Sequence, residues 1–518
     1  MLRKQTALQP IRHLLKMSTC PTPLPIPPSP RKPVIIVGSG LAGLSAATTL
    51  TKRNIPVILV DRAEKPGGNS MKASSGINGA PTRFQSGAED TAEAFYTDTV
   101  KSAGKVFSAS TEKEKEIREK LISTVTNNSA DAVSWLADEM GVDLRKVAQL
   151  GGHTRARTHR GIAGKPPGAA IIGALLDLLK GNPFFELRTK SLVTKVLKEA
   201  KEVIGVEYIT GTNDTPETET TQILHGPVIF ASGGFAGDIH GMVATYRPDL
   251  TGLPSTNEAR AGSQPLLASV GAKLIDMDQV QVHPTGFLDL KGDPECTVKF
   301  LAAEALRGEG GILLLGNGKR FVNELATRDV VTDAITASAV RVESESGLKQ
   351  WDVTLLLDEG AAAALESHMQ FYLWKGLMRK TTLGELEELE DGIFEGVREY
   401  ADIVSGKRKE DEFGRTAFGN WTLRDVQADS VVYVGKVTPV LHFTMGGVQF
   451  NEQSQVLDDG GEPIQGLWAA GEVTGGLHGG NRLGGSSLLE CAVFGRIAGD
   501  NAAVFYEQHY LFGDGVNV

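Results

Sequence analysis

The sequence predicts an α/β protein in which a dinucleotide-binding sheet is split by an inserted α+β region. Residues 34–61 follow the order of buried strand, glycine turn, Ala-rich helix and second strand, which is a βαβ unit of about 30 residues. Strand-like runs at 192–210 and 226–234 are typical of the same sheet. A strand, a glycine loop and a helix then return at 465–505. We therefore expect one nucleotide-binding domain that is interrupted by a second domain.

The pattern between these segments changes in character. Helical periodicity dominates from about residue 90 to residue 140, within the first part of the sheet-forming region. Short strands such as WDVTLLLDE then alternate with charged helices such as TLGELEELEDGIFEGVREYADIVSG. The predicted segments are 1–32 (a basic and Pro-rich start), 33–280 and 442–518 (the nucleotide-binding domain), and 281–441 (the inserted domain).

Composition excludes several classes of protein. The 518 residues are 41% hydrophobic and 22% charged, as in an ordinary globular protein, and the net charge of −10 argues against a nucleic-acid partner. No stretch approaches the roughly 18 apolar residues of a membrane span, so no integral membrane partner is expected. Three cysteines are too few for a disulfide framework or an iron–sulfur cluster, and we expect no metal site. Redox chemistry would therefore need an organic cofactor.

The start of the chain has its own composition. The first 60 residues contain no Asp or Glu, and residues 21–33 include seven prolines. A basic, acid-free start resembles an organelle-targeting presequence, and the proline run predicts an extended linker. We expect a mitochondrial location, with a cytoplasmic or endoplasmic-reticulum location and a merely disordered basic tail as alternatives. Folded structure should begin near Pro33.

The first glycine turn has the spacing of a phosphate-binding motif. Gly38, Gly40 and Gly43 form G-x-G-x-x-G directly after the first strand and open the following helix. These glycines allow a tight turn, a close approach of pyrophosphate and close helix–strand packing, while the helix N-terminus attracts the anion. Asp61 closes the second strand, where it can accept hydrogen bonds from ribose hydroxyls. The motif predicts a dinucleotide site; a purely structural glycine turn is the alternative.

A second small-residue loop, PGGNS followed by ASSGING at 66–79, could line a flat ring system. With this loop the chain resembles the flavoprotein subunit family of fumarate reductases and succinate dehydrogenases, and it is most similar to the soluble, single-chain fumarate reductases of fungi. The resemblance covers about residues 33–512. It implies FAD as the cofactor and a Rossmann-like FAD-binding domain that is split by a capping, or clamp, domain.

The resemblance also implies how FAD is held. Relatives in membrane complexes carry the flavin covalently on a histidine of this loop, but the matching residue here is Ser70, so FAD should be bound non-covalently. The segments VIFASGGFA and GEVTGG resemble two further flavin-contact segments of the family. The residues that we expect to contact FAD are Gly38, Gly40, Leu41, Ala42, Gly43, Asp61, Arg62, Gly68, Asn69, Ser70, Ser74, Ser75, Gly76, Val193, Ala231, Ser232, Gly233, Glu472, Ser487 and Leu488.

Six further residues resemble the substrate site of the family. The resemblance implies that His442 and Arg482 bind one carboxylate of a dicarboxylate and that His283 helps to hold the other. Guanidinium and imidazole N–H groups suit such anions. It further implies that hydride comes from reduced flavin and that Arg328 protonates the neighbouring carbon, with Glu304 and Arg307 as its proton path. Taken singly, each residue has an ordinary alternative: a His-Pro turn, a solvated arginine, or an i, i+3 ion pair on a helix surface.

The chain departs from the family at two places. Many members carry Thr-Gly-Asp-Gly where this chain has Ala261-Gly262-Ser263-Gln264, so a possible flavin-side acceptor and an expected glycine are missing. Many bacterial relatives have a threonine where this chain has Ala303. The first departure puts FAD affinity, or the approach of substrate to the flavin, in question.

These observations favour an FAD-dependent fumarate reductase that supports redox balance under low oxygen. Because the sequence shows no haem motif, we expect electrons from a soluble reduced flavin or another small donor. One alternative is a related flavoprotein that oxidises another dicarboxylate, such as L-aspartate or succinate. A second alternative is a flavin-binding protein with impaired catalysis, which the departure at 261–264 suggests.

Overall fold

The computed structural model describes residues 32–86, 90–162, 165–211, 220–289, 291–293 and 295–511. The predicted targeting segment therefore lies outside the described residues, except for Lys32. Residues from Lys32 onward form one compact unit. Within the described residues, the first regular element is β1 (Val34–Val37), next to the expected start at Pro33.

A nine-stranded sheet carries the predicted nucleotide-binding fold. Its parallel centre consists of β1, β2 (Val57–Val60), β6 (Phe185–Arg188), β10 (Val228–Phe230) and β20 (Pro463–Ala469). β1 pairs in parallel with β2 on one side and with β10 on the other, and β10 pairs in parallel with β20. A strand near residue 465 thus lies two places from β1, which confirms that the late segment rejoins the first sheet.

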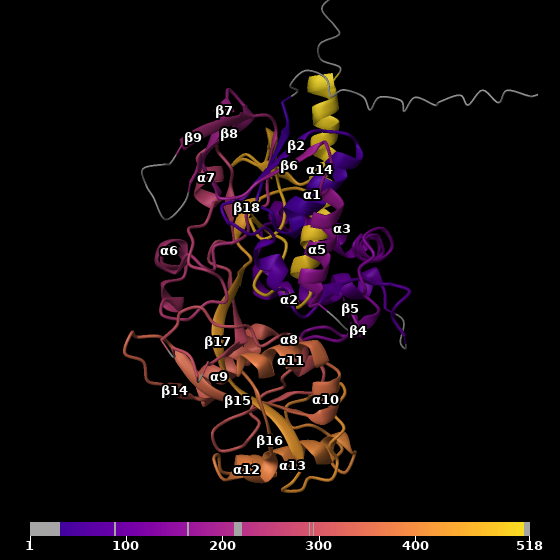
Figure 1. The fold of residues 1–518 in the computed structure, drawn as a ribbon, viewed down its shortest axis with the longest axis vertical. Coiled ribbons are helices and arrows are strands. Elements are labelled where there is room, and N and C mark those ends of the chain that lie inside the picture. Colours follow the sequence, from indigo (N-terminus) through magenta and orange to yellow (C-terminus); the bar gives the residue numbers. More distant parts are fainter. Residues whose placement is uncertain are drawn as a thin grey trace, which may run out of the picture. The chain divides into compact units, whose positions relative to one another are not determined.

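Helices cover this sheet through unusually small side chains. α1 (Leu41–Lys52) and α14 (Ser486–Tyr506) lie side by side, and they share a hydrophobic core with α5 (Pro167–Leu179) (Figure 1). At Gly499 of α14 a Cβ would lie 2.9 Å from the carbonyl oxygen of Ala46, so only glycine allows this separation of the helices. The Ala-rich pattern that predicted α1 therefore reflects close helix packing.

Antiparallel strands extend the sheet at the 192–210 segment. This segment forms a hairpin of β7 (Ser191–Glu199) and β8 (Glu202–Thr210) rather than one continuous strand. Ala200, at the turn, has φ of +50°. β9 (Thr220–His225) pairs with β8, and β19 (Gln455–Leu457) pairs with β20.

The predicted helical stretch at 90–140 is confirmed. It contains α2 (Ala92–Ser108), α3 (Glu112–Asn127) and α4 (Ser129–Ser134), followed by a short π-helix at Trp135–Glu139. α3 begins with a capping box, in which the Thr111 hydroxyl accepts from the Glu114 N–H and the Glu114 carboxylate accepts from the Thr111 N–H.

A second, antiparallel sheet occupies most of the predicted inserted region. Its order is β12 (Val280–Phe287), β17 (Val431–Thr444), β15 (Gln350–Asp358) and β13 (Ile312–Leu314). β14 (Val340–Val342) pairs with β15, and β16 (Arg379–Thr382) pairs with β17. The predicted boundaries near 280 and 441 fall inside β12 and β17, which pair with each other. The division into domains stays a prediction.

Short elements complete the fold. The helices around the second sheet and before it are α6 (Ala244–Tyr246), α7 (Gln264–Ala268), α8 (Glu304–Gly308), α9 (Arg328–Ser338), α10 (Glu359–Ala363), α11 (Glu366–Lys375), α12 (Leu383–Glu387) and α13 (Ile393–Val404). Two three-stranded sheets join β11 (Leu274–Ile275), β18 (Gly447–Gln449) and β21 (Thr474–Gly475), and β3 (Ile77–Asn78), β5 (Thr158–Arg160) and β4 (Lys146–Ala148).

Two helical glycines give a matched test of this packing. A Cβ at Gly43 of α1 would overlap the carbonyl oxygen of Gly38, whereas a Cβ at Gly173 of α5 would meet nothing within 4 Å. We expect Gly43→Ala to lower the free energy of unfolding by about 2 kcal/mol or more, because the turn and helix must move apart. Gly173→Ala should raise it by about 0.5–1 kcal/mol. Urea unfolding of both variants checks the prediction, and equal effects would contradict it.

Candidate active site

Two glycines of the first turn give room to the protein itself. Gly38 has φ of +106°, and a Cβ there would collide with the backbone of Ala231 at the end of β10. A Cβ at Gly43 would collide with Gly38. These two positions therefore set the tight turn and the close helix–strand packing that the motif requires.

Three other glycines border open space. They leave room for a bound cofactor, whereas the glycines of the tight turn are surrounded by protein atoms. A Cβ at Gly233 would meet nothing within 4 Å, and at Gly68 the nearest atom would be 3.9 Å away. At Gly40 a Cβ would approach only the hydroxyl of Ser70, at 3.5 Å. The hydroxyl of Ser74 is buried without a hydrogen-bond partner. The residues predicted for FAD thus fit a bound group, because they combine free space with an unused polar atom.

The start of α1 is held by side chains from two loops. Asp61 accepts from the backbone N–H of Ser39 at 2.8 Å and from the Ser39 hydroxyl, and it also accepts from the N–H of Ala63 at 2.7 Å. The Ser70 hydroxyl accepts from the N–H of Leu41 at 3.1 Å. Asp61 therefore fixes the glycine turn, in addition to the ribose contact predicted for it, and Ser70 lies at the N-terminal end of α1.

The other residues predicted to contact FAD belong to several different elements. Ala231, Ser232 and Gly233 directly follow β10, and Ser487 and Leu488 lie in the first turn of α14. Val193 is a buried residue of β7. Burial raises the pKa of Glu472 to about 7, although its carboxylate accepts from the N–H of Thr444 at 3.0 Å. The other predicted residues are Ala42 in α1, Arg62 after β2, and Asn69, Ser75 and Gly76 in the second loop.

The departure at 261–264 is accommodated by side-chain contacts. The Ser263 and Ser232 hydroxyls are 2.5 Å apart, and the Ala261 carbonyl accepts from Arg62 at 2.7 Å. Gln264 is fully buried, and its amide donates to the Gly233 carbonyl at 3.4 Å. Its Oε1 atom is buried without a partner. The segment thus contacts two residues predicted for FAD, Ser232 and Gly233.

The two substrate histidines lie at irregularities of adjacent strands. The pairing of β12 with β17 skips His442, and it also shifts after His283, where Pro284 has no N–H to donate. The two imidazole rings are 5.3 Å apart. Burial, reinforced by the charge of Arg328, lowers the pKa of both rings well below 6.5, so both are neutral. His283 Nε2 is buried without a partner.

Arg328 is oriented by an ion pair and an amide. Its Nε and Nη2 donate to Glu304 Oε2 at 2.8 and 2.6 Å, and its Nη1 donates to Gln281 at 2.7 Å. Glu304 also accepts from the N–H of Gly151 at 2.8 Å. Burial raises the pKa of Glu304, but the charges of Arg328 and Arg307 outweigh it and lower the pKa to about 2. Glu304 is therefore a carboxylate at neutral pH.

Arg307 is buried, and the alternative of a surface ion pair with Glu304 is wrong. Both side chains are 1% exposed, one turn apart in α8. Arg307 donates from Nη1 to the carbonyl of Glu324 at 2.6 Å, while its Nε and Nη2 have no partner. Burial lowers the pKa of Arg307 to about 10, which makes this guanidinium a readier proton donor than an exposed arginine.

Arg482 lies in the loop before α14. Its guanidinium stacks on the Phe443 ring at 4.5 Å, its Nη1 donates to the Leu483 carbonyl at 3.0 Å, and its Nε is buried without a partner. Burial, with the charge of Arg328, lowers the pKa of Arg482 to about 9. The structure thus brings the six predicted substrate and proton-path residues into one electrostatically coupled cluster.

The cluster has an excess of positive charge. Arg307, Arg328 and Arg482 are buried guanidinium groups, and Glu304 is the carboxylate in direct contact with one of them. Both histidines are neutral. A buried charge without a partner is costly, so the site is built to receive an anion. The buried carboxyl groups of Glu472 and Glu490 also act on Arg482, and that of Glu324 acts on Arg307, so part of this charge is balanced within the protein.

Two residues at the site, Gln281 and Thr256, were not predicted from the sequence. Gln281 accepts from Arg328 and donates to the carbonyl of Arg482 at 2.9 Å, so it connects the two arginines. Its spacing of two from His283 on one strand was a signal for a shared face. Thr256 lies 2.9 Å from Nδ1 of His442, and no local pattern marked it.

The described residues contain neither a metal-binding group nor a membrane-spanning helix. In the ranges that the structure describes, no group of three or more His, Cys, Asp or Glu side chains is arranged to hold a metal ion. Within the same ranges no helix has the length and apolarity needed to cross a bilayer.

Buried histidines should make stability depend on pH. Burial lowers the pKa of His153, His159 and His368 to about 4, against 6.5 for an exposed histidine. Below pH 6.5 the unfolded chain binds protons that the folded chain does not bind. The free energy of unfolding therefore has its full value above pH 6.5. It falls as the pH drops toward 4, and at pH 5 it is lower by about 1–2 kcal/mol per histidine. Urea unfolding at pH 7 and pH 5 tests this, and an unchanged midpoint would contradict it.

Comparison with known proteins agrees with this geometry. Residues 33–488 match the family model described as FAD binding domain. The chain is 43% identical over 486 residues to fumarate reductase 1 of Saccharomyces cerevisiae, covering 91% of this chain and 98% of that protein. It is 38% identical to the fumarate reductase of Schizosaccharomyces pombe, covering 90% of this chain and 89% of that protein.

The fold also matches a solved structure of the same group. A flavocytochrome c3 fumarate reductase in an open conformation superposes with a TM-score of 0.68 and 32% identity, over 92% of this chain and 79% of that one. Both the sequence and the fold therefore support one assignment. The chain belongs to the FAD-binding family that includes the fungal fumarate reductases.

Proposed function

We propose that this protein is an FAD-dependent oxidoreductase that reduces fumarate to succinate and so supports redox balance under low oxygen. The observation that carries the proposal is the buried cluster of Arg307, Arg328 and Arg482, with Glu304 as the contacting carboxylate. Arg307 and Arg482 have buried N–H groups without a partner, and such groups suit the carboxylates of fumarate. The relationship to yeast fumarate reductases supports the same reaction.

The binding groups act at two ends of the substrate. Arg482 has an unused Nε–H, and with the neutral ring of His442 it would bind one carboxylate. His283 has an unpartnered Nε2, and this nitrogen would donate to the other carboxylate. Nδ1 of His283 lies 3.2 Å from both the N–H and the carbonyl oxygen of Thr285, and the tautomer that accepts from this N–H carries its proton on Nε2.

The chemical step combines a hydride and a proton. Bound FAD supplies the hydride when it is reduced. Arg328 would donate the proton to the neighbouring carbon, since its guanidinium has N–H groups beyond those that bind Glu304 and Gln281. Glu304 would then return to Arg328 a proton that it takes from Arg307, and Arg307 would regain its proton from solvent. The guanidinium groups would also stabilise the negative charge that develops on the substrate carboxylate.

The electron donor and the direction of flux form the finer part of the proposal. We propose a soluble reduced flavin, or another small donor, as the source of electrons. Oxidation of L-aspartate or succinate is the alternative, and a flavin-binding protein with impaired catalysis is the third possibility. Assays with reduced flavin plus fumarate, and with each dicarboxylate plus an electron acceptor, separate the three. Turnover of aspartate without turnover of fumarate would refute the proposal of fumarate reduction.

We also propose that the basic start of the chain directs the protein to mitochondria. The acid-free, basic composition of residues 1–32 supports this location. A fluorescent protein fused behind these residues should be imported into mitochondria, whereas diffuse cytoplasmic or endoplasmic-reticulum fluorescence would favour the alternatives.

Arg328→Ala tests the proposed acid. The change removes the proton donor but not the predicted FAD contacts, so kcat for fumarate should fall by about 10²–10⁴-fold while the protein keeps its bound FAD. Arg341→Ala, at an exposed arginine of β14, is the matched control and should leave kcat unchanged. Steady-state rates and the flavin spectrum of each variant provide the measurement. An Arg328→Ala variant with normal turnover would remove this residue from the mechanism.

The mode of FAD attachment can be tested separately. Ser70 cannot form a histidyl link to the flavin, so acid precipitation of the purified protein should release the yellow cofactor into the supernatant. Absorbance of pellet and supernatant measures the division. Flavin that stays with the pellet after washing would show a covalent bond and contradict the prediction.

A further inference from the structure

We propose that His153 is a positioning residue for the substrate arginine, because its Nε2–H holds the backbone carbonyl of Gly484, two residues after Arg482. The distance from His153 Nε2 to this oxygen is 3.0 Å, and the side chain is 5% exposed. His153 would not touch the substrate. The inference rests on the proposed function, since it assigns His153 to the placement of the carboxylate-binding group of that reaction.

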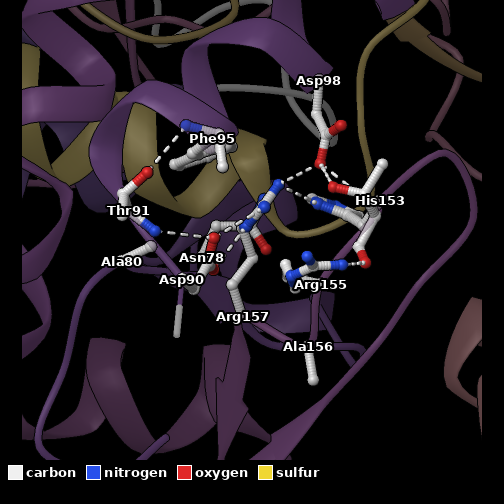
Figure 2. A network of polar contacts seen from close by, with 12 residues as sticks. Asn78, Ala80, Asp90, Thr91, Phe95, Asp98, His153, Arg155, Ala156 and Arg157 are labelled. Carbon is white, nitrogen blue, oxygen red and sulfur yellow. Dashed lines mark hydrogen bonds and ion pairs between the residues drawn. The ribbon is translucent and has the colours of Figure 1, made fainter. Parts of the chain in front are cut away.

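A buried arginine holds the other side of the His153 ring. Arg157 has no exposed surface, and its Nη1 lies 3.2 Å from Nδ1 of His153 (Figure 2). Nε and Nη2 of Arg157 donate to the two oxygens of Asp90 at 2.8 and 2.9 Å, and Nη1 donates to Asp98 at 2.6 Å. The guanidinium also lies over the Phe95 ring at 4.9 Å. Three residues, Asp90, Asp98 and Phe95, therefore fix the guanidinium that faces Nδ1.

These neighbours select one tautomer of His153. A guanidinium is only a donor, so Nδ1 must be the nitrogen that accepts from Arg157. A carbonyl oxygen is only an acceptor, so Nε2 must carry the proton that points to Gly484. An imidazolium would place an Nδ1–H against the Arg157 guanidinium. Burial and this charge lower the pKa of His153 to about 4, in agreement with a neutral ring.

The carbonyl that His153 holds belongs to the loop that carries Arg482. Asn78 Nδ2 also donates to the Gly484 oxygen, at 2.8 Å, and to the Ser486 hydroxyl, at 2.9 Å. The two side chains thus occupy both lone pairs of this oxygen. Arg482 itself makes its side-chain hydrogen bond within the loop, to Leu483. Gln281 also donates to the Arg482 carbonyl, at 2.9 Å, so the position of Arg482 depends on how the loop backbone is held at both Arg482 and Gly484.

The short segment of residues 151–153, which contains His153, also contacts the proposed proton path. The N–H of Gly151 donates to Glu304 at 2.8 Å, and the N–H of Gly152 donates to the Leu325 carbonyl at 3.1 Å, three residues before Arg328. Residues 151–153 therefore contact both the acid side and the carboxylate-binding side of the cluster. A shift of this loop would move the two sides relative to each other, and misplacement by about 1 Å can cost a large rate factor.

Three variants test the inference. His153→Leu keeps the bulk but removes both hydrogen bonds, so we expect KM for fumarate to rise at least about tenfold while bound FAD is retained. His153→Gln offers an amide N–H to Gly484 and an amide oxygen to Arg157, so KM should return to within about threefold of wild type. His159→Leu is the control for loss of a buried imidazole: His159 is buried in β5 and bonds to the Thr82 hydroxyl and the Arg157 backbone carbonyl instead of to Gly484, so KM should be unchanged.

The outcomes separate the inference from the proposed function. A wild-type protein that does not reduce fumarate would refute the proposed function. Wild-type turnover together with an unchanged KM in His153→Leu would overturn only the inference, as would a His153→Gln variant as impaired as His153→Leu.

A measurement on the wild-type protein covers the case in which His153→Leu does not fold. Nitrogen-15 NMR of histidine-labelled protein at pH 7, with the His153 signal assigned by its loss in His153→Gln, should show a neutral ring with the proton on Nε2. A charged ring, or a proton on Nδ1, would overturn the inference whatever the activity of the variants.

Discussion

The buried carboxylate of Glu304 is the interaction on which the rest of the site depends. It is 1% exposed, and it bonds Arg328 through two N–H groups and Gly151 through its backbone. Gly484 leaves the room that it needs, since a Cβ there would lie 2.9 Å from Oε2. Removing this anion would leave buried guanidinium groups uncompensated, at a cost of about 3–5 kcal/mol. One carboxylate thus orients Arg328 and bonds the neighbouring loop at Gly151, and it lies beside Gly484 in the loop of Arg482.

The balance around Glu304 explains why the histidines are neutral. Burial already disfavours the imidazolium form, and nearby guanidinium groups oppose it further at His283 and His442. Positive charge is therefore concentrated on the arginines, while the histidines are neutral groups that can donate hydrogen bonds. The strand irregularities at His283 and His442 aim these donors at a common region.

The sequence predicted the local parts of this protein well and the long-range parts poorly. The βαβ unit and the glycine turn could be identified because their residues lie within 30 positions of one another and follow known periodicities. The contacts of His153 with Gly484 and of Thr256 with His442 join residues more than 180 positions apart. Such pairs leave no local pattern, and only the folded chain reveals them. Gln281 is intermediate, because strand period placed it beside His283.

The glycine content shows the same limit in physical terms. Gly38, Gly43 and Gly484 lack a side chain because protein atoms come close to them, whereas Gly40 and Gly233 border open space. Composition cannot separate the two kinds, and only the second kind leaves room for a ligand. At residue 264, where the family pattern expects a glycine, the buried glutamine turns back toward Gly262 and Gly233. Arg62 bonds to Ala261 and Ser232 bonds to Ser263, and these contacts hold the segment in place. Side-chain hydrogen bonds beside the predicted FAD site thus compensate for the missing glycine.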